Sequence, residues 1–101
     1  MFTATMIYEF KKRDFEKGCN FWQEEIFKYA STQRGFVRMQ FLVNAPKAMA
    51  IGTWLNKTCA KDFMATGVFK RLLDKIKPLL VRLPSQSTWE LLYFEEAKRE
   101  K

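Results

Sequence analysis

The side chains in this sequence that could do chemistry are aromatic or cationic, and none is an imidazole. Trp54 carries an indole N–H that can donate a hydrogen bond to a bound molecule, and Arg38 carries a guanidinium that can bind an anionic oxygen. Histidine is absent from all 101 residues. This absence excludes Ser/His and Cys/His nucleophile–base pairs, histidine-ligated metal sites and an imidazole base near neutral pH. Trp54 is also compatible with a plain core position, and Arg38 with a salt bridge at a rim.

Four further side chains are candidates for acid–base or hydrogen-bonding roles. Tyr8, Tyr29 and Tyr93 are phenolic donors, and they could equally be core or dimer residues. Asp62 could act as a base if it were buried, but in the first turn of a helix it would rather interact with the helix dipole. The sequence contains no P-loop, no dinucleotide fingerprint and no metal-ligand spacing. We therefore expect neither a metal nor a cofactor.

Length and composition indicate one domain over residues 1–101. The chain is 48% hydrophobic and 16% aromatic, which is too apolar for a disordered protein. A domain of this size has a high surface-to-volume ratio, so we expect some aromatic side chains at an interface or around a cavity. Pairing with a second copy of the chain would cover them.

The sequence indicates a cytoplasmic protein that does not span a membrane. No segment approaches the roughly 20 apolar residues that a spanning helix requires, and the alternating stretch 1–12 meets charge too early for a signal peptide. Cys19 and Cys59 lack metal-type spacing, so we interpret them as reduced thiols. The net charge of +7 is scattered along the chain, which is typical of a solvated surface but leaves a nucleic-acid partner open.

Hydrophobic periodicity predicts the first half of the fold. Alternation by twos predicts strands over 2–11, 36–43 and 47–55, the last two joined as a hairpin by the breakers at 44–46. Between the first and second strands a helix is expected after the potential N-cap Asp14. Its apolar stripe recurs at spacings of four and three, at Phe15, Cys19, Trp22, Ile26 and Tyr29.

A second helical segment and a last strand complete the order. Asn56 or Thr58 can cap the helix, which Gly67 is expected to divide into two pieces. Pro78 stops it, and the final strand is predicted over Thr88–Glu95. The resulting strand–helix–strand–strand–helix–strand order is that of a ferredoxin-like α+β domain with a four-stranded antiparallel sheet.

The side chains on one face of the predicted third strand are unusually small. Ala48, Ala50 and Gly52 share the face of Trp54. Small residues there leave space beneath the helices, which favours a ligand cavity, but they are also typical of close packing between a helix and a sheet.

In this order the sequence resembles the antibiotic biosynthesis monooxygenase-like (ABM) family of dimeric α+β barrel proteins, over nearly the whole chain. The residues that carry the resemblance are Gly35-Phe36, Gly52-Thr53-Trp54, Asp62-Phe63, the segment Gly67 to Lys70, and Leu79-Leu80. The resemblance implies a homodimer in which two four-stranded sheets face each other as a barrel. It also implies a small cavity between each sheet and its own helices.

Two branches of this superfamily imply different chemistry. The haem-degrading branch needs a helix histidine as iron ligand, and an alignment on Trp54 puts that position at Leu73 and the accompanying Asn position close to Thr5. Leucine cannot ligate iron. The other branch resembles cofactor-independent oxygenases and quinol-handling enzymes, in which the deprotonated substrate supplies the electrons and the protein binds it, keeps it dry and steadies its charge.

The resemblance therefore implies a cofactor-independent monooxygenase or quinol-type oxygenase that acts on a small aromatic substrate. The catalytic residues that we expect are Trp54 and Arg38. The expected substrate-binding residues are Thr5, Trp22, Ala50, Gly52, Phe63, Phe69 and Leu73. The alternative is a non-catalytic homodimer that binds a small ligand or is purely structural, in which aromatic residues at helical spacing such as Trp22 are core.

A second resemblance concerns RNA-recognition domains. The segment from Arg34 to Phe41 resembles the basic-Gly-aromatic opening of their signature, which places stacking aromatics on a sheet. Arg38 stands where that signature has an aromatic residue, and the segment falls on the second strand rather than the third. Nucleic acid is therefore not the partner that we expect.

Overall fold

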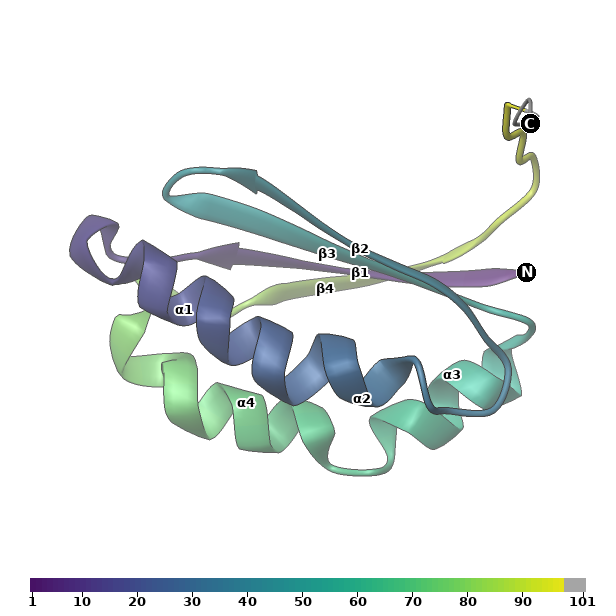
Figure 1. Cartoon of the computed structure of the whole chain (residues 1–101), viewed down its shortest axis with the longest axis horizontal. Coiled ribbons are helices and arrows are strands. Elements are labelled where there is room, and N and C mark those ends of the chain that lie inside the picture. Colours follow the sequence, from purple (N-terminus) through teal and green to yellow (C-terminus); the bar gives the residue numbers. More distant parts are fainter. Residues whose placement is uncertain (98–101) are drawn as a thin grey trace, which may run out of the picture.

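Four strands form one antiparallel sheet, and the helices all cover the same face of it (Figure 1). The structure is a computed structural model that describes residues 1–97, so the last four residues of the predicted domain lie outside the described part. The strands are β1 (Phe2–Glu9), β2 (Phe36–Asn44), β3 (Lys47–Trp54) and β4 (Ser85–Glu90), in the sheet order β2-β3-β1-β4. The helices are α1 (Phe15–Trp22), α2 (Lys28–Ala30), α3 (Lys57–Met64) and α4 (Val68–Ile76). The predicted ferredoxin-like α+β fold is confirmed.

The alternation predicted from the sequence decides which side chains meet the helices. On β1 the side chains of Met6 and Tyr8 face the helices, and their partners on the neighbouring strand β3 are Ala50 and Ala48. Large residues on one strand thus lie beside small ones on the next, and Tyr8 is buried to 1% exposure. The opposite face of the sheet carries no helix (Figure 1).

A β-bulge on β2 changes which residues of that strand face the helices. The register of β2 with β3 shifts between Phe36 and Arg38, so that Phe36 pairs with Trp54 and Met39 with Gly52. Phe36 and Met39 therefore both face the helices although they are three residues apart. Arg38 lies between them and points to the open face of the sheet.

The first helical segment contains a π-helical turn, Gln23–Phe27, between α1 and α2. Four residues of an α-helix rotate the chain by about 40° more than a full turn, and a wider π turn reduces this excess rotation. Positions four residues apart thus stay on one buried line, which consists of Gly18, Trp22, Ile26 and Ala30. The predicted stripe is corrected at its end, since Tyr29 is 37% exposed and Ala30 takes the buried position.

The helix cap and the helix break agree with the predictions from the sequence, with one exception. The side chain of Asn56 accepts a hydrogen bond from the backbone N–H of Cys59 at 2.9 Å and begins α3. Gly67, at φ 82°, separates α3 from α4 as predicted. Asp14 makes no capping hydrogen bond, because a short 3-10 turn over Lys12–Asp14 leads into α1 instead.

The last strand is displaced from its predicted position. It spans Ser85–Glu90 rather than Thr88–Glu95. The prediction followed the apolar run after Thr88, but β4 is an edge strand whose polar residues pair with β1 from Ile7 to Phe2. Leu92 and Tyr93 lie beyond the sheet and are 74% and 86% exposed.

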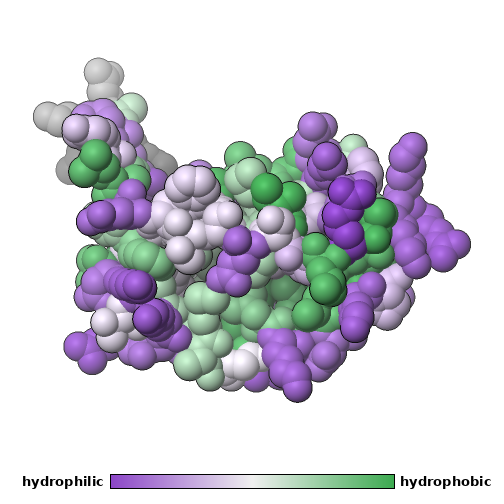
Figure 2. All heavy atoms as spheres, turned by 180° about the vertical axis from the view of Figure 1, so that it is seen from behind, coloured by the Kyte–Doolittle hydropathy of each residue, from purple (hydrophilic) through white to green (hydrophobic). Residues whose placement is uncertain are grey.

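Apolar surface is extensive for so small a protein. Figure 2 shows hydrophobic residues across the middle of one face, with hydrophilic residues around them. Before the segment 91–97 that follows β4, the exposed large apolar side chains include Ile7, Leu42, Val43, Val81, Leu83 and Trp89. Within residues 1–97 no helix is long and apolar enough to cross a membrane.

Gly18 allows α1 to approach the end of β1, and this gives a first prediction. A Cβ added at Gly18 would lie 2.2 Å from Cε1 of Phe10, whose side chain is only 1% exposed. We expect Gly18→Ala to lower the free energy of unfolding by about 2 kcal/mol, despite the better helix propensity of alanine. Thermal unfolding should show a fall in Tm of about 10 °C. Lys17→Ala on the exposed side of the same helix is the control, and an unchanged Tm in Gly18→Ala would contradict the packing described here.

Candidate functional site

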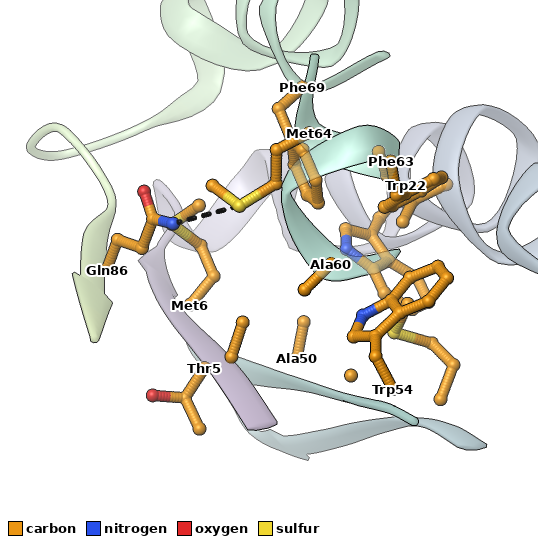
Figure 3. Close-up of a pocket in the computed structure, with 14 residues that line it drawn as sticks. Thr5, Met6, Trp22, Ala50, Trp54, Ala60, Phe63, Met64, Phe69 and Gln86 are labelled. Carbon is orange, nitrogen blue, oxygen red and sulfur yellow. Dashed lines mark hydrogen bonds between the residues drawn. The ribbon is translucent and has the colours of Figure 1, made fainter. Parts of the chain in front are cut away.

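A narrow apolar cavity lies between the sheet and the helices, beneath Trp54 (Figure 3). Its free volume for the centre of a water-sized sphere is about 30 Å³, enough for one or two water molecules. Among the described residues, none of the side chains around it is ionisable. They are Ala4, Thr5, Met6, Trp22, Ile26, Met39, Ala50, Gly52, Trp54, Ala60, Phe63, Met64, Phe69 and Gln86.

Aromatic rings from four elements form the walls of this inner cavity. Trp54 on β3 packs against Phe63 on α3 with ring centroids 4.9 Å apart, and Phe63 meets Phe69 on α4 edge to face at 5.5 Å. Trp22 on α1 closes another side and stacks on Phe41 at 4.2 Å. Figure 3 shows the indole nitrogens of Trp22 and Trp54 turned toward the interior of the cavity. The site thus offers flat apolar surfaces and two potential N–H donors.

Small residues of β3 form the floor. Ala50 and Gly52 lie on the helix-facing side of the strand and are buried. A Cβ at Gly52 would lie 3.2 Å from Cε of Met39 and 3.4 Å from Nε1 of Trp54. The empty space predicted over the small face of this strand is therefore present, although side chains of methionine reach into it.

A wider outer cavity adjoins the inner one along α4. Its free volume on the same measure is about 350 Å³. Met6, Phe69 and Gln86 line both cavities, so the two spaces meet at these side chains. The outer cavity is lined in addition by Tyr8, Lys70, Leu72, Leu73, Ile76, Leu83 and Pro84. Together they make a pocket with a broad mouth and a narrow aromatic end.

Methionine side chains control the width of the narrow end. Met6, Met39 and Met64 all line it, and Nε2 of Gln86 lies 3.7 Å from Sδ of Met64 (Figure 3). Unbranched thioether side chains change rotamer at small energetic expense and adapt to the shape of a bound molecule. The inner cavity can therefore widen without a change in the backbone.

Two buried polar atoms lie beside the pocket without hydrogen-bond partners among the described residues. They are the hydroxyl of Tyr8 and Nε1 of Trp22. Burial raises the pKa of Tyr8 far above its usual value, and the neighbouring indole N–H of Trp22 offsets only part of this effect. Tyr8 is therefore a neutral phenol, and a potential donor, at every pH near neutrality.

This pKa shift gives a prediction for alkaline stability. In the unfolded chain Tyr8 loses its proton near pH 10, whereas the folded protein retains it. Above about pH 10 the unfolded state therefore binds fewer protons, so the free energy of unfolding falls by up to about 1.4 kcal/mol per pH unit from this group. Denaturant unfolding at pH 9 to 11.5 should show that the free energy of unfolding falls less steeply with pH in Tyr8→Phe than in the wild type. An identical decrease in the free energy of unfolding in both proteins would contradict this prediction.

The structure brings together six of the residues proposed from the sequence. Trp54, Trp22, Ala50, Gly52, Phe63 and Phe69 all line the inner cavity. Leu73 lines the outer cavity instead. Thr5 contacts the inner cavity only along its backbone, since its hydroxyl lies on the other face of the sheet, where it accepts a hydrogen bond from Nε1 of Trp89 at 3.0 Å (Figure 3).

Arg38 does not reach either cavity, because the bulge on β2 directs it to the open face. Its guanidinium pairs with Glu96 at 2.5 Å and lies 4.4 Å from the ring centroid of Phe94. Arg38 thus binds the segment that follows β4, as the alternative salt-bridge interpretation expected. Asp62 is exposed on α3, and Tyr29 and Tyr93 are exposed as well.

Sequence reasoning missed several lining residues. Met6, Met39, Met64 and Gln86 come from four different elements. The signal for Met6 was present in the alternation of β1, which puts it beside Ala50. Met39 could not be placed, because the bulge moves it to the helix-facing side.

The donor chemistry of the pocket does not fit haem ligation. Leu73, at the position implied for an iron ligand, presents only aliphatic carbon to the outer cavity. Histidine is absent from the sequence. Within residues 1–97, no three His, Cys, Asp or Glu side chains cluster as a metal site would require.

Comparison with known proteins identifies the fold. No protein-family model matches the chain, and no curated protein sequence matches it. A candidate antibiotic biosynthesis monooxygenase from Nitrosomonas europaea matches in structure with a TM-score of 0.81 at 12% identity, over 92% of this chain and 100% of that one. A protein of unknown function from the same organism matches with a TM-score of 0.82 at 14% identity, over 96% and 94%.

A third similar structure contains a ligand. It is a monooxygenase from Streptomyces coelicolor in complex with nanaomycin D, with a TM-score of 0.78 at 12% identity, over 96% of this chain and 92% of that one. At such identities the likeness establishes a shared fold. The resemblance to antibiotic biosynthesis monooxygenase-like proteins is therefore confirmed at the level of architecture.

Proposed function

We propose that this protein is a cofactor-independent monooxygenase or quinol-type oxygenase that acts on a small aromatic substrate in the pocket between sheet and helices. The observation that carries the proposal is the inner cavity. Its walls are the rings of Trp22, Trp54, Phe63 and Phe69, and no ionisable side chain of residues 1–97 lines it. Proteins that share the fold include monooxygenases, one of which is in complex with the ligand nanaomycin D.

The proposed reaction needs little chemistry from the protein. A hydroxyaromatic ketone with an activated CH₂ group loses a proton from that carbon, and the resulting anion gives its electrons to dioxygen. One oxygen atom forms the new carbonyl and the other leaves as water, so that CH₂ and O₂ become C=O and H₂O. The protein contributes a dry site that holds the ring flat between Trp54 and the floor at Ala50 and Gly52.

The shape of the pocket sets the binding mode. The outer cavity admits the molecule past Leu73 and Leu83, and the ring then enters the narrow end as Met39 and Met64 move aside. Among residues 1–97, Lys70 is the one cation on the lining of the two cavities, and at the mouth it can attract a substrate with phenolate character.

We also propose that the protein is a cytoplasmic homodimer whose sheets pack open face to open face. Leu42, Met49 and Ile7 are partners across β2, β3 and β1 and form one apolar row on that face. Leu42 and Ile7 are 49% and 42% exposed. An uncovered sheet face of this kind is typical of a surface that a partner covers.

A non-catalytic ligand-binding homodimer is the second candidate. It is favoured by the same absence of an ionisable group, since the inner cavity offers no base to accept the proton of a substrate. In the enzyme hypothesis the substrate must be acidic enough to lose its proton without a base from the protein. The proton then leaves through the outer cavity to solvent.

One experiment separates the two candidates. Anthrone, whose CH₂ group lies between two aromatic rings and opposite a ketone, is incubated with the protein in air, and anthraquinone formation is followed by absorbance. The enzyme hypothesis expects a rate well above the spontaneous oxidation. Saturable binding of anthrone by tryptophan fluorescence without any rate increase would favour the binding protein, and neither effect would contradict both.

A further inference from the structure

The hydroxyl of Tyr8 and Nε1 of Trp22 form a buried polar pair. Neither makes a hydrogen bond of normal geometry among the described residues, although the indole N–H lies beside the phenol oxygen. Tyr8 is 1% exposed and Trp22 is 2% exposed. Burial of an unpaired hydroxyl or N–H destabilises a folded protein, because the group gives up its hydrogen bonds to water. A pair of such groups on neighbouring elements therefore calls for a partner from outside the chain.

The pair lies where the two cavities adjoin. Trp22 lines the inner cavity, Tyr8 lines the outer one, and the indole N–H lies next to the phenol oxygen. Both cavities share the lining of Met6 and Phe69. A molecule that fills the pocket from mouth to narrow end must pass this point.

The surroundings of the pair are otherwise aromatic. The ring of Tyr8 stacks on Phe10 at 6.0 Å and meets Phe41 at 6.5 Å, and Trp22 lies between Phe41 and Phe27. These neighbours provide no acceptor and no charge. A neutral acceptor oxygen can satisfy the two donors at little desolvation cost.

A π turn follows Trp22 and keeps the helix on the sheet. Trp22 is the last residue of α1, and the turn Gln23–Phe27 follows it directly. The wider turn keeps Ile26 on the same buried line, so that the helix continues to cover the sheet beyond the tryptophan. The indole is thus held by packing on both sides, which fixes the direction of its N–H.

We infer that Tyr8 and Trp22 donate hydrogen bonds to a ketone or quinone oxygen of the aromatic ligand, which makes the preferred ligand a planar aromatic carbonyl compound. This inference rests on the proposed pocket and names its polar anchor. In the oxygenase reaction, loss of a proton from the activated CH₂ group moves negative charge onto that carbonyl oxygen. The two donors then stabilise the charge as it develops.

Two probes of equal shape test the anchor separately from the pocket. 9-Fluorenone carries the carbonyl and fluorene lacks it, and both are inert toward thiols. Calorimetric or fluorescence titration of the wild type should give about tenfold tighter binding of fluorenone than of fluorene, as one or two neutral hydrogen bonds provide. In Tyr8→Phe this preference should fall to about threefold or less.

A spectroscopic readout distinguishes a donor from a merely structural side chain. The C=O stretching band of bound fluorenone should lie at lower frequency in the wild type than in Tyr8→Phe, and Trp22→Phe should shift it in the same direction as Tyr8→Phe. Without ligand, Tyr8→Phe should unfold about 4 °C higher, because it removes an unpaired buried hydroxyl. Tyr29→Phe, which removes an exposed phenol hydroxyl, is the control and should change none of these values.

The outcomes separate this inference from the proposed function. If fluorene and fluorenone both bind but neither Tyr8→Phe nor Trp22→Phe alters the preference or the C=O band, the anchor is wrong and the pocket stands. If neither probe binds to the wild type, the pocket and the anchor are both overturned. A lower Tm in Tyr8→Phe would also count against the anchor, since it would mean that the hydroxyl already has a partner.

Discussion

Replacement of Ala50 by valine is expected to weaken the binding of an aromatic ligand by roughly 100-fold, or about 2.7 kcal/mol. Ala50 lies on the floor of the inner cavity opposite Met6, and the free space above this floor is only about 30 Å³. Two added methyl groups point into the volume that the ring must occupy. Valine is at the same time well suited to a strand, so that the sheet should form normally.

The control for this prediction is Ala48→Val. Ala48 lies two residues earlier on the same face of β3, is buried to 3% exposure and lines neither cavity. Both substitutions add the same volume to the core and should destabilise the protein by a similar 1–3 kcal/mol or so. Only Ala50→Val should lose binding of fluorene, as measured by fluorescence titration. Equal affinities in the two variants would place the ligand elsewhere.

Replacement of Ile7 by glutamate is expected to convert the proposed dimer into monomers. Ile7 lies at the β1 end of the apolar row on the open sheet face, next to Met49 on β3. In a symmetric dimer one substitution appears twice, so two carboxylates would be buried in one interface without cations. We expect the dissociation constant to rise by roughly 100-fold or more. Light scattering should then give 12.0 kDa where the wild type gives twice that mass.

Val43→Glu is the matched control for the interface. Val43 is 57% exposed, compared with 42% for Ile7. It pairs with Ala48 and therefore belongs to the helix-facing side of β2, near the end of the hairpin. A dimer that survives Val43→Glu but not Ile7→Glu locates the interface on the open face. Dissociation in both variants, or in neither, would argue against sheet-to-sheet pairing.

The sequence by itself determined the order of the elements and most of the cavity floor. The alternation in β1 and β3 depends only on the period of two in an extended chain, so it correctly places Ala50, Gly52 and Trp54 on one face. Gly67 divides the helical segment for an equally local reason, since its φ of 82° disfavours any other residue. These features need no knowledge of what packs against them.

The direction of Arg38, one of the proposed site residues, was decided by the tertiary structure. Arg38 faces the open side of the sheet because the bulge next to it shifts the register of β2 against β3. A linear pattern cannot contain a register shift, because the shift exists only relative to the partner strand.

The polar anchor was also decided by tertiary structure. Tyr8 comes from a strand and Trp22 from a helix, and each reads in the sequence as an ordinary core aromatic. Their polar atoms become neighbours because the helix packs across β1 and the π turn keeps Trp22 and Ile26 on one buried line. Periodicity predicts which face of an element is buried. Whether two unpaired donors lie close together depends on how the buried faces of two elements pack against each other.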